Sequence, residues 1–153
     1  MKFEERLKEL GITLPAVVTP MASYTPAVVS GAYVFVSGQL PLVEGKLKFT
    51  GRVGREVSID EANECARIAV LNCLAAIRNV VGSLDKIKRI VRITGYVRGG
   101  EDFNDHPRVL NGASDLLVEI FGDAGVHTRS AVGSSGLPLG APVEVEMIVE
   151  VEA

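Results

Sequence analysis

The end of the chain alternates strictly between two kinds of side chain, and this pattern constrains the fold most. Residues 143–152 place an apolar side chain at every second position: Val143, Val145, Met147, Val149 and Val151. The positions between them carry Glu144, Glu146, Glu150 and Glu152 around Ile148. Successive side chains of a strand point to opposite faces of a sheet, so the pattern predicts a strand with one buried and one acidic face. Like charges on one sheet face repel, which favours screening by water or by cations from another chain.

Two helices are predicted upstream of this strand. From Ile59 to Val81, small and branched apolar residues recur at helical spacing: Ala62, Cys65, Ala66, Ala69, Cys73, Ala76, Ile77 and Val80. Ser58 and Glu61 match a capping box at its start, and Gly82 suits the left-handed position after its end. The small residues indicate close packing against a sheet. A second helix is predicted from Asn104 to Phe121, ended by Gly122.

The remaining elements are short. We expect a helix over Phe3–Leu10, a hairpin of Ala27–Ser30 and Tyr33–Ser37, a break at Gly38–Pro41, and strands at Lys46–Thr50, Ile87–Val97 and Ser130–Val132. The Gly-rich segment Gly133–Gly140 joins two strands rather than opening a helix, so it is interpreted as a hairpin connection and not a phosphate-binding loop. This order predicts an α+β two-layer sandwich, a mixed sheet with both main helices on one face.

Composition bounds the function. The 153 residues are 47% hydrophobic and 23% charged with a net charge of −3, which predicts a single domain over residues 1–153. The acidic balance argues against electrostatic binding to nucleic acid or to an anionic membrane. The charged N-terminus does not resemble a signal peptide, and no apolar run is long enough to span a bilayer, so we expect a cytoplasmic protein. The mean hydropathy of +0.27 is high for a small monomer.

Cysteine and histidine spacing predicts no metal site. Cys65 and Cys73 lie eight residues apart in one predicted helix. Helical rise separates them by about 12 Å, too far for a disulfide, so both are interpreted as small core residues. His106 and His127 are distant from them in sequence and form no metal-ligand spacing with them. Nucleotide-binding, P-loop and zinc-protease motifs are also absent.

Three charged residues are candidates for chemistry. Arg129 begins a predicted strand, where a fixed guanidinium suits bidentate binding of a carboxylate, although most arginines are ordinary surface residues. Glu144 and Glu146 suit orientation or activation of a water molecule, but a solvated strand face also explains them. From the residues alone both interpretations stay open, and the local context favours the surface arginine and the solvated strand face. His127 is interpreted as a loop residue, and His106 as a first-turn residue of the second helix.

Several short motifs together resemble those of one family. They are Ser37-Gly38-Gln39-Leu40-Pro41, Asn111 in a helix, Arg129-Ser130-Ala131-Val132, Leu137-Pro138 and Val143-Glu144-Val145-Glu146. Their order and spacing resemble the YjgF/Rid (reactive intermediate deaminase) family, also called endoribonuclease L-PSP, from about Tyr24 onward. The resemblance implies a chorismate-mutase-like fold and a homotrimer whose sheets form a central barrel with ligand clefts between subunits.

The resemblance also implies an activity. It points to a cofactor-independent deaminase that hydrolyses reactive 2-imino or enamino acids to 2-keto acids and ammonia. In that pattern Arg129 binds the substrate carboxylate, while Glu144 and the backbone carbonyl of Ala131 position the attacking water. The cleft lining is implied to include Ser37, Gly38 and Asn111. No metal or organic cofactor is implied, because an iminium carbon is already electrophilic.

The chain departs from the family pattern near its N-terminus. Deaminase members usually carry a cleft tyrosine directly after Gly-Pro, whereas Tyr24 here precedes Thr25-Pro26-Ala27. Tyr24 is kept as a candidate substrate-binding residue. Ala131 stands where a cysteine is frequent and still supplies a carbonyl. Residues 1–22, an N-terminal helix and extension, mark a divergent subgroup, and residues 23–153 form the Rid-like core.

Two other functions are weighed against the deaminase. A non-catalytic trimer that binds small carboxylates or acts in regulation would need Arg129 for affinity but would release no ammonia. Ribonuclease activity is disfavoured, because the net charge is −3 and no cationic general-acid cluster is evident. A trimer would account for the high hydropathy, because each sheet would be partly buried against neighbouring subunits.

Overall fold

The computed structural model describes residues 2–17, 19–20 and 22–152. Its helices and strands, in chain order, are α1 (Phe3–Glu9), β1 (Ala27–Ser30), β2 (Tyr33–Gln39), β3 (Leu42–Val43), β4 (Lys46–Leu47), α2 (Ile59–Val81), β5 (Ile87–Val97), α3 (His106–Phe121), β6 (Thr128–Gly133) and β7 (Val143–Val151). Short 3-10 turns follow α2, follow α3 and precede β7, at Leu84–Lys86, Gly122–Gly125 and Pro138–Gly140.

Helix α2 has the bounds that the sequence predicts, and its capping box is confirmed. Ser58 Oγ accepts a hydrogen bond from the Glu61 backbone at 3.1 Å, and Glu61 Oε1 accepts one from the Ser58 backbone at 2.9 Å. Gly82 ends the helix at φ +93°, in the region that favours glycine. Cys65 and Cys73 are 1% and 0% exposed, which confirms them as core residues. Burial raises the pKa of the Cys65 thiol to about 12, so this thiol is unreactive at neutral pH.

Strand β7 lies in the middle of the five-stranded sheet, whose order is β1-β2-β7-β5-β6. It pairs antiparallel with β2 on one side and with β5 on the other, and β5 pairs parallel with β6. The valine face of β7 is buried, and the glutamate face is half-buried, as the alternation predicts. The interpretation of 133–140 as a hairpin connection is wrong, because β5 lies between β6 and β7.

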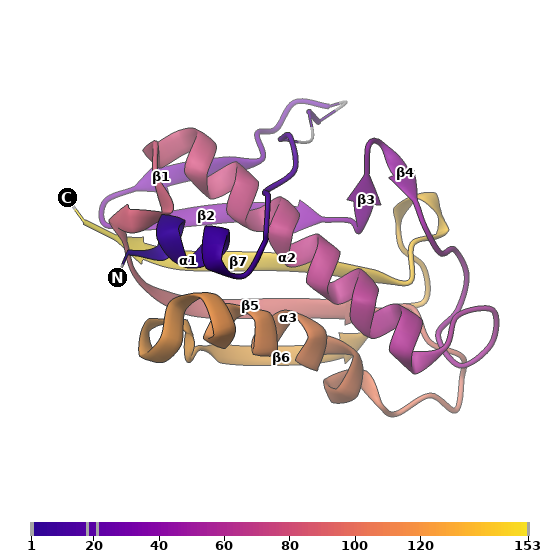
Figure 1. Cartoon of the computed structure of the whole chain (residues 1–153). Helices are drawn as coiled ribbons and strands as arrows, with labels where there is room; N and C mark the ends of the chain where they lie inside the picture. Colours follow the sequence, from indigo (N-terminus) through magenta and orange to yellow (C-terminus); the bar gives the residue numbers. More distant parts are fainter. Residues whose placement is uncertain (1, 18, 21, 153) are drawn as a thin grey trace.

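Both main helices cover the same face of the sheet (Figure 1). Helix α2 crosses β1, β2 and β7, while α3 lies over β5 and β6. The predicted two-layer α+β sandwich is therefore confirmed. Helix α1 adds to the helical layer: the Phe3 ring packs edge-on against Phe121 at a centroid distance of 4.7 Å. Glu4 accepts a hydrogen bond from the Leu84 backbone at 2.7 Å, which ties α1 to the turn after α2.

The other sheet face is covered by none of the described helices and carries large apolar side chains. Val28 pairs across the strands with Phe35, and Phe35 pairs with Ile148. Val28 and Phe35 are 51% and 43% exposed. We call this side, which also bears the β7 glutamates, the open face. An apolar row of this kind across a sheet is typical of a surface that another protein or another copy covers.

Several elements differ from their predicted bounds. Strand β2 runs on to Gln39, because a register shift after Val36 lets pairing resume between Gln39 and Val145. The strand predicted at 46–50 is only Lys46–Leu47, paired with β3 in a separate two-stranded sheet. Strand β6 is longer than predicted, since its pairing with β5 extends from Thr128 to Gly133. Helix α3 begins at His106 rather than at 104, and His106 is the first-turn residue expected.

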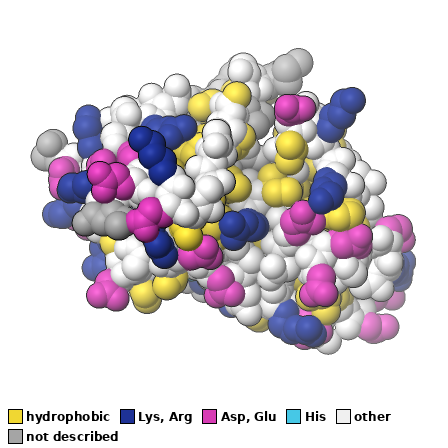
Figure 2. Space-filling view, in the orientation of Figure 1, with side chains coloured by type: hydrophobic (Ala, Val, Ile, Leu, Met, Phe, Trp, Pro, Cys, Tyr) yellow, Lys and Arg dark blue, Asp and Glu magenta, His cyan; other side chains and the backbone are white. Residues whose placement is uncertain are grey.

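The helical side of the molecule is electrostatically mixed. Figure 2 shows cationic and anionic side chains interspersed over this side, with no extended region of one sign. Within the described part of the chain, no helix has the length and apolar character needed to cross a membrane.

The close approach of α3 to α2 predicts that a side chain at Gly112 would lower the stability of the fold. A Cβ atom at Gly112 of α3 would collide with the backbone carbonyl of Asn63 in α2. We expect Gly112→Ala to lower the free energy of unfolding by about 1–3 kcal/mol, the usual cost of overpacking. Urea denaturation checks this. Gly136→Ala is the control, because a Cβ there meets no atom within 4 Å, and equal effects of both substitutions would contradict the prediction.

Candidate functional site

Arg129 is held against α3 by two hydrogen bonds. It lies opposite Ile93 of β5, a buried residue, so its side chain faces the helical layer. Its Nη1 atom donates to Asn111 Oδ1 at 2.9 Å and to Ser114 Oγ at 3.1 Å. Asn111 and Ser114 are three residues apart and therefore share one side of α3. The structure thus brings Asn111 and Arg129 into direct contact, while their predicted roles in binding stay predictions. Ala131 follows on the same side of β6, opposite Gly95.

His127 continues this cluster. It lies in the loop before β6, as predicted, but its ring makes two hydrogen bonds. Nε2 lies 2.9 Å from Ser114 Oγ, and Nδ1 lies 2.6 Å from the carbonyl oxygen of Gly125. We call Asn111, Ser114, His127 and Arg129 the arginine cluster.

Glu144 lies on the open face, directly over the backbone of Gly38. A Cβ atom at position 38 would lie 2.8 Å from Glu144 Oε2, so a side chain there would displace the carboxylate from its present position. Burial and, to a smaller extent, the negative charge of Glu146 raise the pKa of Glu144. A carboxylate with a raised pKa is a better proton acceptor near neutral pH, which is the property that a general base needs.

Tyr96 links the second glutamate to the sheet. Its hydroxyl donates to Glu146 Oε1 at 2.5 Å. This hydrogen bond favours the protonated phenol and raises the pKa of Tyr96. Tyr96 is also the direct cross-strand partner of Glu144. Glu144, Glu146 and Tyr96 thus form a second group, which with Gly38 we call the glutamate cluster.

Ser37 and Tyr24 lie near the glutamate cluster. Ser37 Oγ donates to the carbonyl of Thr25 at 2.6 Å, which fixes the segment before β1 beside β2. Tyr24 is 59% exposed. It lines a cavity of about 80 Å³ together with Pro20, Gly38, Gln39, Leu40 and Leu42. The structure thus places Tyr24 next to Gly38 although it lies on the other side of the proline from the family tyrosine; its predicted role in binding stays a prediction.

Within one chain, the two clusters do not meet. Glu144 of β7 pairs with Tyr96 of β5, and Tyr96 pairs with Val132 of β6. Val132 lies three residues beyond Arg129 along β6. Two strand spacings across the sheet and three residues along it separate the Cα atoms of Glu144 and Arg129 by roughly 14 Å. The side chains also point to opposite faces, since Glu144 lies between two buried valines and Arg129 opposite a buried isoleucine.

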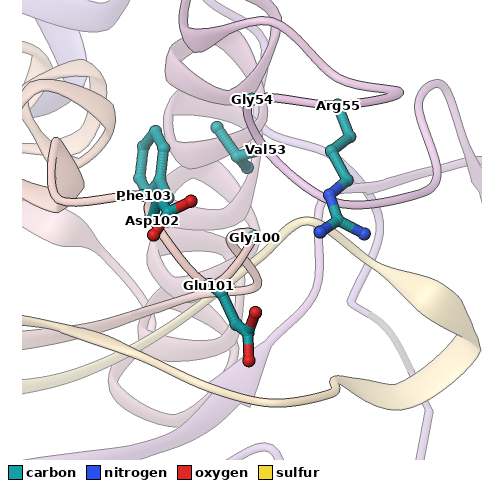
Figure 3. Close-up of a pocket in the computed structure, with 7 residues that line it drawn as sticks. All are labelled: Val53, Gly54, Arg55, Gly100, Glu101, Asp102 and Phe103. Atoms are coloured by element: carbon teal, nitrogen blue, oxygen red, sulfur yellow. The ribbon is translucent and has the colours of Figure 1, made fainter.

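Another cavity, of about 280 Å³, lies elsewhere. Val53, Gly54 and Arg55 line one side, and residues 100–103 line the other (Figure 3). Arg55 extends along one wall, whereas Glu101 and Asp102 belong to the opposite loop. None of the residues predicted to form the site lines this cavity. In the described part of the chain, no group of three or more His, Cys, Asp or Glu side chains is arranged to hold a metal ion.

Sequence reasoning did not identify Ser114, Tyr96 or the contacts of His127. Ser114 lies one residue beyond the buried Ala113, and no pattern distinguishes it from an ordinary helix serine. Tyr96 lies within the strand predicted at Ile87–Val97, but that prediction assigns it no partner. The three-residue spacing of Asn111 and Ser114 places both on one side of the helix, but it does not indicate which strand that side faces.

The fold and the two clusters define a class: a small α+β sandwich with a helix-bound arginine and an open acidic sheet face. The model of the family described as "YjgF/chorismate mutase-like, putative endoribonuclease" matches residues 4–151. The chain belongs to this family, the YjgF/Rid family, as the motifs predict.

Individual relatives agree with this assignment. Protein TCP17 of Trypanosoma cruzi is 39% identical over 94% of this chain and 91% of its own length. A 2-iminobutanoate/2-iminopropanoate deaminase of Dermatophagoides farinae is 31% identical over 92% of this chain and 95% of its own. The crystal structure of a putative endoribonuclease from Shewanella oneidensis superposes with a TM-score of 0.95, at 35% identity, covering 99% of this chain and 100% of the other.

The pKa of Glu144 gives a prediction that does not depend on any activity. Glu146→Gln removes the neighbouring charge but keeps an oxygen to accept from Tyr96, so we expect the pKa of Glu144 to fall. Carboxyl NMR titration of the two proteins measures the change. Glu150→Gln, on the same face of β7 beside Lys88, is the control and is expected to leave that pKa in place. An unchanged pKa in Glu146→Gln would contradict the coupling.

Proposed function

We propose that the protein hydrolyses 2-imino acids, or their enamine tautomers, to 2-keto acids and ammonia. The observation that carries the proposal is Arg129: its guanidinium is fixed by Asn111 and Ser114 and keeps one edge without a partner among the described residues. A fixed guanidinium edge matches the two oxygens of a carboxylate. The 31% sequence identity with the 2-iminobutanoate/2-iminopropanoate deaminase of Dermatophagoides farinae supports the same substrate class.

The chemistry needs only a positioned water and a proton acceptor. Water adds to the imine carbon, and Glu144 accepts one of its protons as the C–O bond forms. That proton passes to the imine nitrogen. When the C–N bond breaks, the hydroxyl proton follows the same route, so ammonia leaves and the carbonyl forms. The raised pKa of Glu144 supports this role, and the carbonyl of Ala131 is a second acceptor for the water.

Each cleft is proposed to form between two copies in a homotrimer. The distance between the clusters supports this, because a small imino acid cannot touch Arg129 and Glu144 of one chain together. The open face supports it as well, since its row of Val28, Phe35 and Ile148 would be buried by a neighbour. In such a cleft Arg129, Asn111 and Ala131 come from one subunit, and Gly38 and Glu144 come from the next.

Substitution of Arg129 tests whether its guanidinium binds the carboxylate of the substrate. We expect Arg129→Lys, which keeps the charge but loses the bidentate geometry, to lower kcat/KM for 2-iminobutanoate by about 10- to 100-fold. The imine is generated by a threonine dehydratase, and its disappearance is followed with and without the protein. Arg108→Lys is the matched control, because Arg108 is an exposed residue of α3 paired with Asp105.

The imine assay, combined with a binding measurement, separates the two candidate functions. A wild-type protein that binds 2-oxobutanoate through Arg129, yet does not accelerate imine loss, would contradict the deaminase and favour the non-catalytic carboxylate-binding module. Full activity in Arg129→Lys would contradict the assignment of Arg129.

Shared clefts predict complementation. Arg129→Ala and Glu144→Gln are each expected to be inactive, but co-expressed subunits form mixed trimers in which one cleft of three has both groups intact. Random mixing then restores roughly a quarter of wild-type activity. Differently tagged subunits and light scattering, expected at three times the 16.3 kDa of one chain, check assembly. No recovery in verified mixed trimers would show that the clefts are not shared.

A further inference from the structure

Both hydrogens of Arg129 Nη1 are already engaged. One is donated to Asn111 Oδ1 and the other to Ser114 Oγ. A guanidinium has five N–H groups, so the three that remain are on Nε and Nη2. Those two atoms have no hydrogen-bond partner among the described residues. They lie on the same edge of the guanidinium plane, and that edge has the spacing of a carboxylate.

The directions of the hydrogen bonds that link Gly125, His127, Ser114 and Arg129 follow from the Gly125 carbonyl. The Gly125 carbonyl oxygen can only accept, so His127 Nδ1 must carry the hydrogen. In the neutral ring Nε2 then holds the lone pair and must accept, which makes the Ser114 hydroxyl the donor. The hydroxyl hydrogen is therefore committed to His127, and the oxygen lone pairs remain for Arg129 Nη1. Each bond thus fixes the polarity of the next.

We propose that His127 is a positioning residue for Arg129. Acting through Ser114, it holds Nη1 against α3, so that the Nε and Nη2 edge faces the cleft and a carboxylate binds side-on to these two atoms. The ligand class rests on the proposed function, whereas the positioning is a property of the unliganded chain. Asn111 supports the same Nη1 atom but makes no hydrogen bond to His127 among the described residues.

Nitrogen NMR tests the positioning without any ligand. With only two histidines in the chain, the spectrum of His106→Phe assigns His127. We expect His127 to be the Nδ1–H tautomer at pH 8, and the Arg129 Nη1 group to rotate slowly. Ser114→Ala should make that rotation fast, while Ser114→Thr, which keeps the hydroxyl, should leave it slow. The Nε2–H tautomer, or rotation unaffected by Ser114→Ala, would overturn the proposal.

Binding and kinetics test the consequence for the ligand. Calorimetry with 2-oxobutanoate is expected to show affinity about tenfold weaker in Ser114→Ala and in His127→Phe, as for the loss of one hydrogen bond to a charged group. Ser114→Thr and the matched His106→Phe should stay within about twofold of wild type, because His106 contacts Phe103 rather than the arginine cluster. In the imine assay KM should rise more than kcat falls, since Arg129 orients the carboxylate and not the reacting carbon.

The outcomes separate this proposal from the deaminase assignment. Slow Arg129 rotation and the Nδ1–H tautomer in a protein with no imine hydrolysis would sustain the positioning and refute the activity. Imine hydrolysis that depends on Arg129 but is unaffected by His127→Phe would support the deaminase activity and refute the positioning role of His127. A wild-type protein that does not bind 2-oxobutanoate would refute the side-on carboxylate.

Discussion

The structure depends on strand β7 having two different faces. Its valines, among them Val145 and Val149, lie on the buried side beneath α2. Because side chains alternate along a strand, the same nine residues must place Glu144 and Glu146 on the opposite face. Pairing with strands on both sides then fixes the height of each glutamate, so that Glu144 lies over Gly38 and beside Tyr96. The alternation of apolar and acidic residues along β7 therefore determines both the core packing and the position of Glu144, the candidate base.

Close packing of α3 positions the other cluster in a similar way. Gly95 of β5 leaves room for Leu110, and Gly112 leaves room for the backbone of α2. A side chain at either glycine would push α3 away from the sheet or from its neighbour. At the observed spacing, Asn111 and Ser114 reach Arg129 Nη1 at ordinary hydrogen-bond distances. Gly95 and Gly112 thus allow the close approach of α3 that lets Asn111 and Ser114 hold the guanidinium of Arg129.

Local periodicity predicted the long elements well, since α2, β5 and β7 each carry a pattern over nine or more residues. Periodicity did not predict which strand pairs with β6. A strand of six residues has no feature that distinguishes pairing with β5, which the structure shows, from pairing with β7. Arg129 was identified through the family motif together with its place at a strand start. The contacts of Ser114 and His127 were not predictable, because they depend on which helix turn lies above β6.

The placement of the two clusters on opposite faces links the proposed chemistry to assembly. In one chain Glu144 is only half-buried, and its raised pKa comes mainly from that partial burial. In the proposed trimer, a neighbouring subunit over the open face would exclude more water, which raises the pKa of Glu144, while the guanidinium of its Arg129 would approach the same cleft and act in the opposite direction. The arginine would then hold the carboxylate of the substrate rather than neutralise Glu144, because its Nη1 atom is retained by Asn111 and Ser114. Under the proposed assembly, a single contact between subunits would thus bring the carboxylate-binding arginine and the candidate base into one cleft.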